Sequence, residues 1–201
     1  MCGCPAQTPA WGGGGKSSTD TDGGGSTGDD TGGGDTASDT ADTADTVDTA
    51  DSAETPVGTG YDVGDVAYDL EATDANGDDW SLYSALGSPI VLVVGHMDYP
   101  DMVSTMDALP DVHRDSVGAV IVALVGRNEY STYASEADAV RWQDAYDLDV
   151  ALIDPLSTTV DLWSEDNSPR TYVIGRDMGI VWVSFGAVSA SDLITALESA
   201  P

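Results

Sequence analysis

The stretches Pro89-Ile-Val-Leu-Val-Val94 and Gly118-Ala-Val-Ile-Val-Ala-Leu-Val125 decide the fold of this chain. Each is an unbroken apolar run rich in β-branched residues, which is typical of a strand buried on both of its faces. Between them, after a polar break at residues 96–101, Met102, Met106 and Leu109 recur at helical spacing. Two buried strands joined through a helix predict an α/β domain.

The flanking sequence extends this pattern in both directions. Upstream, residues 65–72 alternate as a short strand, and Asp74-Ala-Asn-Gly77 is a turn signal that leads to Trp80. Downstream we expect a helix opened by Ser135 and Asp138, a strand at Val150–Ile153, a hairpin of Arg170–Ile174 with Ile180–Phe185, and a last helix capped by Ser189 and Asp192. Strands that alternate with helices and end in an antiparallel pair predict three layers around a mixed sheet.

Three segments resemble the thioredoxin-like redoxins, a superfamily that includes TlpA-type thiol oxidoreductases, AhpC/TSA peroxiredoxins and Sco copper chaperones. Residues 77–87 are similar to the segment before the first core strand, and residues 91–105 to the strand and active-site loop. Ser168-Pro-Arg-Thr-Tyr-Val-Ile174, followed by Asp177-Met-Gly-Ile180, is similar to the segment that holds the family's cis-proline. The resemblance covers residues 57–201 and implies a thioredoxin-like three-layer α/β/α sandwich with a central mixed sheet. It also implies a cis peptide bond at Pro169 and a substrate groove beside Pro169 and Arg170.

The resemblance places the family's cysteines at positions that hold no sulfur nucleophile here. The peroxiredoxin pattern puts the attacking cysteine at Val103, and the Sco pattern puts two cysteines at Tyr99 and Val103. The TlpA pattern puts them at Tyr99 and Met102, or at Asp98 and Asp101 in a shifted register. Thiol–disulfide exchange needs a thiolate, so we assign no catalytic residue. The degenerate active-site loop comprises His96, Met97, Asp98, Tyr99, Pro100, Asp101, Met102 and Val103.

Two other kinds of chemistry compete with simpler interpretations at this loop. His96, Met102 and Met106 offer the soft ligands that suit copper, but the methionines also fit a hydrophobic core, so no cofactor is predicted. Asp98 and Asp101 could act as acid and base or bind a hard cation. The favoured interpretation is that one of these aspartates is the N-terminal cap of the following helix, because no nearby base or second set of ligands is evident. We expect His113 near the C-terminal end of that helix.

Residues 1–56 differ in composition from the rest and predict a disordered acidic tether. Up to Glu54 this region holds 11 acidic residues, 12 glycines and one base, Lys16, and from Asp39 to Asp51 an aspartate recurs at every third position. Both cysteines of the chain, Cys2 and Cys4, lie at its start. Such a stalk resembles the tether of bacterial lipoproteins, which makes either cysteine a lipidation candidate. The sequence itself contains no apolar signal, so the expected extracytoplasmic, membrane-anchored location depends on processing upstream of Met1.

The charge of the chain excludes several classes of partner. The formal net charge is −30, and beyond Glu54 there are 25 acidic residues against five arginines and no lysine. Such a surface repels nucleic acid and anionic lipid, and no apolar run is long enough to predict a membrane-spanning segment. The leading hypothesis is therefore a tethered binding or scaffold protein with an unidentified protein or peptide partner. The alternatives are a thioredoxin-like or peroxiredoxin-like oxidoreductase and a Sco-like copper-binding protein.

Overall fold

The computed structural model describes residues 55–116, 118–164 and 168–201. Its strands are β1 (Glu71–Asp74), β2 (Asp79–Ser81), β3 (Ile90–Gly95), β4 (Val120–Val125), β5 (Val150–Ile153), β6 (Arg170–Ile174) and β7 (Ile180–Phe185). Its helices are α1 (Pro100–Asp115), α2 (Glu136–Tyr146), α3 (Thr158–Trp163) and α4 (Ala190–Glu198), with a 3-10 turn, η1, at Leu82–Ala85. The predictions for the acidic tether, Cys2 and Cys4 lie outside the described residues.

The strands form one mixed sheet in the order β2-β1-β5-β4-β3-β6-β7. The two apolar runs pair as parallel neighbours, since Ile90 lies opposite Val120 and Gly95 opposite Val125. Strand β5 continues the parallel centre, whereas β6 and β7 on one side and β1 and β2 on the other run antiparallel. The mixed sheet predicted from the sequence is confirmed.

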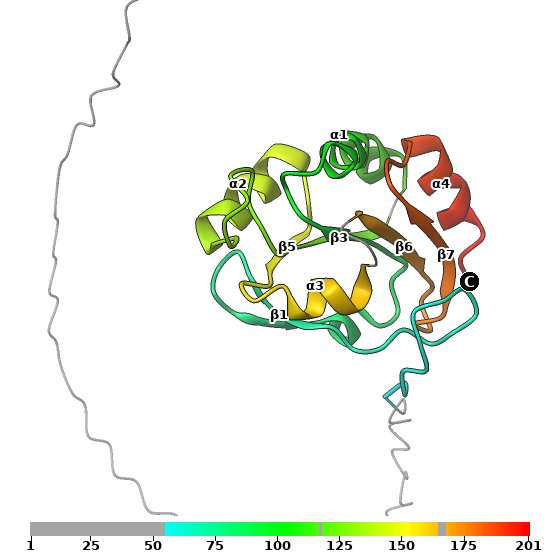
Figure 1. Ribbon diagram of the computed structural model, residues 1–201. Coiled ribbons are helices and arrows are strands. Elements are labelled where there is room, and N and C mark those ends of the chain that lie inside the picture. The colour runs from blue at the N-terminus through cyan, green and yellow to red at the C-terminus, as the bar shows by residue number, and fades with distance from the viewer. Residues whose placement is uncertain (1–54, 117, 165–167) are drawn as a thin grey trace, which may run out of the picture. The chain divides into compact units, whose positions relative to one another are not determined.

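Helices cover both faces of this sheet, which gives the predicted three layers. In Figure 1, α1, α2 and α4 lie on one face and α3 lies on the other. The core is divided accordingly: one buried cluster joins the sheet to α1, α2 and α4, and a second joins it to α3 and η1. Alternate residues of β3 feed alternate clusters, with Val91 and Val93 toward α1 and Leu92 and Val94 toward α3.

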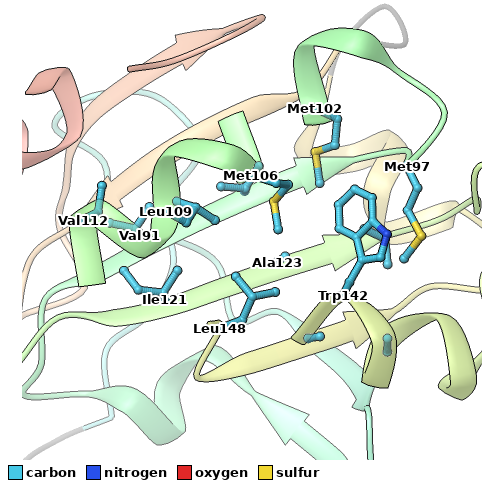
Figure 2. Close-up of a cluster of buried hydrophobic side chains, with 14 of the residues drawn as sticks. Val91, Met97, Met102, Met106, Leu109, Val112, Ile121, Ala123, Trp142 and Leu148 are labelled. Atoms are coloured by element: carbon cyan, nitrogen blue, oxygen red, sulfur yellow. The ribbon is translucent and has the colours of Figure 1, made fainter. Parts of the chain in front are cut away.

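Helix α1 has the apolar face that its spacing predicts. Met102, Met106 and Leu109 are fully buried, and Figure 2 shows these side chains on the side of α1 that faces the strands of the sheet. Pro100 occupies the first turn, where its missing N–H costs nothing because that N–H would be unpaired. The helix therefore begins immediately after the loop that joins it to β3.

The predicted caps and hairpins are also present. Ser135 and Asp138 form a reciprocal capping box on α2, and the Oγ of Ser189 accepts a hydrogen bond from the N–H of Asp192 at the start of α4. The Asp74 carboxylate accepts hydrogen bonds from the N–H groups of Asn76 and Asp78, which forms the turn between β1 and β2.

Two expectations need correction. The strand expected at residues 65–72 is not continuous, because the backbone at Val66 and Ala67 makes only isolated bridges, to Gly179 and Gly60, and β1 begins at Glu71. Helix α3, which lies between β5 and β6, was also not predicted from the sequence. The carboxylate of Asp154 accepts hydrogen bonds from the N–H groups of Thr159 and Val160, and this stabilises the first turn of that helix.

Candidate functional site

The loop after β3 and the segment before β6 lie against each other at the carboxyl end of β3. A Cβ atom added to Gly95 would lie 3.2 Å from Cα of Pro169 and 3.3 Å from Sδ of Met102. Gly95 therefore permits the close approach of Pro169 to the end of β3. This contact brings residue 169 next to the N-terminus of α1, where the sequence predicted a site.

A cavity of about 240 Å³ opens at this contact, and we call it the Pro169 groove. It is lined by Tyr99, Pro100, Asp101, Ser168 and Pro169. Of the positions where the family resemblance expects cysteine, Tyr99 and Asp101 line the groove, Met102 is buried beside Gly95, and Val103 is 37% exposed. No cysteine occurs anywhere in residues 55–201, so no thiol of the described domain faces the groove.

The residues considered for copper lie on two faces of the sheet. Met97, Met102 and Met106 belong to the cluster under α1. The His96 ring instead approaches Gly126 and Ser157 on the α3 side, because it follows Val94 in the alternation of β3. Among the described residues there is no group of three or more His, Cys, Asp and Glu side chains placed to hold a metal ion. The thioethers act as core residues, as the simpler interpretation expected.

The two aspartates of the loop have separate surroundings. Oδ2 of Asp98 accepts a hydrogen bond of 2.6 Å from Oγ of Ser131. The N-cap residue of α1 is Tyr99, and no side chain caps this helix, so neither aspartate is the cap that the sequence suggested. Asp101 lies in the first turn, where its negative charge is favourable to the helix dipole. The carboxylate of Asp101 lies near Gly186, since a Cβ atom added to Gly186 would be 3.2 Å from Oδ2 of Asp101.

Arg170 does not line the Pro169 groove. Its side chain is buried, donates hydrogen bonds to the Tyr61 carbonyl and the Asp62 carboxylate, and lies 4.8 Å from the ring centre of Phe185. Its neighbour in the alternation, Tyr172, belongs to the α3-side cluster. Arg170 therefore holds the segment around Tyr61 against the sheet, and Pro169 alone of the two predicted residues faces the groove.

His113 lies in the last turn of α1, as predicted, where it pairs with Asp147 at 3.0 Å. The His113 side chain is about one third exposed and the Asp147 side chain is mostly exposed, so their ion pair contributes little to the stability of the fold.

Comparison with known proteins agrees with this architecture. The thioredoxin domain of a thiol-disulfide oxidoreductase from Bacteroides vulgatus superposes with a TM-score of 0.56 at 14% identity, over 69% of this chain and 96% of that chain. The fold is thioredoxin-like. A DsbF homologue from Corynebacterium diphtheriae gives a TM-score of 0.53 at 22% identity, over 74% of this chain and 96% of that one. The exposed lipoprotein thioredoxin of Streptococcus pneumoniae gives 0.50 at 16% identity, over 65% and 98%. No family model and no curated protein matches the sequence.

Within this thioredoxin-like domain, His96 is a buried titratable group in contact with Tyr99, a residue that lines the groove. Its side chain is 2% exposed, and its ring contacts the Tyr99 ring edge-on with 5.3 Å between ring centres. Burial lowers the pKa of His96 below its ordinary value of 6.5, and the positive charge of Arg127 lowers it further. The nearby carboxylates of Asp98, Asp161 and Asp154 act in the opposite direction. His96 is therefore neutral near pH 7.

The neutral state of His96 gives a testable pH dependence. Below pH 6.5 the unfolded chain binds a proton at His96 more readily than the folded chain does, so protonation favours unfolding. We expect full stability above that pH and a loss as the pH falls below it, at up to about 1.4 kcal/mol per pH unit. Urea unfolding between pH 7.5 and 4.5 measures this, and His96→Gln should have a shallower slope. His113→Gln is the control; a change of slope as large in that variant would contradict the assignment.

Three further residues at this edge of the thioredoxin-like sheet were missed by the sequence analysis: Gly126 after β4, and Asp154 and Ser157 after β5. All three follow parallel strands at their carboxyl ends, the edge where open α/β sheets place their ligands. None of the helices in the described ranges has the length and apolar character that spanning a bilayer requires.

Proposed function

We propose that residues 57–201 are a non-catalytic binding domain that receives an extended segment of a partner protein in the Pro169 groove. The single observation that carries this proposal is the composition of the groove: aromatic, proline and polar residues line it, and residues 55–201 supply no thiol to it. A thioredoxin fold without a thiolate at this position retains the shape for binding and lacks the nucleophile.

The backbone beside the groove supports binding by strand addition. Among the described residues, neither the N–H nor the C=O of Ser168 has a backbone hydrogen-bond partner, and only Pro169 separates this residue from β6. The carbonyl of Pro169, by contrast, accepts a hydrogen bond from the N–H of Gly186. An extended segment that pairs with Ser168 would lengthen the sheet at this point.

The charge of the domain indicates the chemistry of the partner segment. Asp101 lines the groove, and the ring of Tyr99 lies within the electrostatic influence of Asp98 and Asp161. The positive charge of Arg127 acts on the same ring in the opposite direction. A segment carrying lysine or arginine is therefore favoured over an acidic one.

The experiment titrates a fluorescent eight-residue peptide of alternating valine and lysine into the full-length chain and follows anisotropy. We expect saturable binding, weaker binding of the valine–glutamate peptide, and new protection of the Ser168 amide against hydrogen exchange. Asp101→Asn should weaken the affinity for the lysine peptide by about 1.5- to 5-fold, which is the range expected for the loss of an exposed ion pair.

The matched control is Asp107→Asn, which makes the same charge change on an exposed position of the same helix. Equal losses in both variants would indicate attraction to the acidic surface as a whole. If neither peptide bound to the protein, the proposed function would be contradicted.

We further propose that the domain is displayed outside the cytoplasm on the tether of residues 1–56, with Cys2 or Cys4 as a lipid-anchor candidate. The likeness to a pneumococcal lipoprotein thioredoxin supports this location. The alternative function is thiol–disulfide or peroxide chemistry, and the similar Bacteroides vulgatus protein is described as a thiol-disulfide oxidoreductase. Because residues 55–201 hold no cysteine, that chemistry would require Cys2 and Cys4.

A further inference from the structure

A second polar site lies on the α3 face of the sheet, on the side opposite the α1 core. Ser157, the residue before α3, is 5% exposed, and its backbone has the left-handed φ of +57°. Its Oγ is buried and has no hydrogen-bond partner among the described residues. A buried hydroxyl without a partner costs about 1–3 kcal/mol, so this atom calls for one.

The Nδ1 atom of His96 is in the same condition and points to the same place. His96 is 2% exposed, and this nitrogen also has no partner among the described residues. A Cβ atom added to Gly126 would lie 2.6 Å from Oγ of Ser157 and 3.0 Å from Nδ1 of His96. Because both polar atoms lie this close to one point, a single water molecule can bridge them with two hydrogen bonds of about 2.8 Å each.

The neighbouring carboxylates are in part engaged elsewhere. The Asp154 carboxylate accepts from the N–H groups of Thr159 and Val160, and Oδ2 of Asp98 accepts from Oγ of Ser131, whereas Oδ1 of Asp98 is buried and has no partner among the described residues. Burial of the His96 ring and the positive charge of Arg127 both lower the pKa of the imidazole. The site therefore combines a neutral imidazole and a hydroxyl, and these suit a small uncharged ligand that both donates and accepts hydrogen bonds.

We propose that His96 Nδ1 and Ser157 Oγ together bind one buried water molecule at the carboxyl ends of β3, β4 and β5. The water satisfies both atoms and fixes the orientation of the His96 ring. That ring contacts Tyr99, so the hydrated pair also holds one wall of the Pro169 groove in place. This site is independent of whether the groove binds a partner.

Protein–water NMR on the labelled full-length chain tests the site directly. The carbon-bound Hε1 of His96 is expected to show a rotating-frame Overhauser effect to water in the wild type. The effect should survive in Ser157→Ala, where no serine hydroxyl can relay it, and should vanish in Gly126→Ala, whose methyl group would occupy the space. Its absence in the wild type would overturn the proposal.

Thermal unfolding supplies a second readout that does not depend on Gly126→Ala folding. Ser157→Ala removes one hydrogen bond to the bound water, and we expect its Tm to fall by about 2–6 °C. Thr171→Val is the matched control, because the hydroxyl of Thr171 is also buried and unpartnered among the described residues but belongs to β6. We expect no fall in its Tm. A rise in Tm for both variants would mean that the Ser157 hydroxyl binds nothing.

Discussion

Replacing Met106 with alanine is expected to lower the free energy of unfolding by about 2–5 kcal/mol. Met106 is fully buried in the cluster between α1 and the sheet, and Figure 2 shows it between Met102 and Leu109 along the inner face of α1. Truncation removes three side-chain heavy atoms and leaves a cavity that the parallel strands beneath cannot close. Urea denaturation measures the effect as a lower midpoint with an unchanged m-value.

Val103→Ala is the matched control, because Val103 lies on the same helix but is 37% exposed. Its cost should stay within about 0.5 kcal/mol. If Met106→Ala cost no more than this control, the methionine would not be a core residue, and its assignment as a structural side chain would be wrong. Such a result would reopen the question of a ligand role for its thioether.

The centre of the fold could be predicted because its signal is local. The runs at Ile90–Gly95 and Val120–Val125 are apolar at every position, and only strands covered on both faces need that composition. The apolar spacing of α1 and the capping pair of α2 are likewise contained within a few residues. Each of these predictions is confirmed.

Other features depend on contacts between distant segments, and the local sequence carries little sign of them. Arg170 donates a hydrogen bond to Asp62, which is 108 residues away in the sequence. The residues next to Arg170 therefore do not indicate that its side chain lies outside the groove. Met178 takes the left-handed φ of +67° in the β6–β7 turn, although Gly175 and Gly179 flank it. Its fully buried side chain, part of the α3-side cluster, accounts for that choice.

Two missed features did have a signal. Val160 and Trp163, three residues apart after Asp154-Pro155, have the spacing of a short helix with one buried face, which is what α3 is. The period of two along β3 also separates Val93 and Gly95 from Val94 and His96. Counting along that strand is enough to place His96 on the opposite face of the sheet from Met102 and Met106.

The candidate site was predicted by position but not by geometry. The sequence resemblance indicated the loop at residues 96–103 and Pro169, and the structure brings Tyr99 and Pro169 together in one groove. The approach of His96 and Ser157 to the same point beside Gly126 depends on where β4 and β5 end. The lack of a thiol in residues 55–201 is a property of the amino-acid sequence alone.

The absence of thiol chemistry is the second prediction with a large expected effect. A thioredoxin-like enzyme attacks a disulfide or a peroxide with a thiolate at the start of α1, and the groove presents Tyr99, Asp101 and Pro169 instead. Carboxyl and phenol groups cannot form the mixed disulfide on which the exchange depends. Turnover should therefore be absent rather than reduced, whatever the pH.

The most direct test measures insulin-disulfide reduction and hydrogen peroxide consumption by the full-length chain, with dithiothreitol as reductant, against a protein-free blank. We predict rates equal to the blank, for the wild type and for the Cys2→Ser/Cys4→Ser variant alike. Turnover above the blank that disappears in the double variant would contradict the account, because the amino-terminal thiols would then supply the nucleophile that the groove lacks.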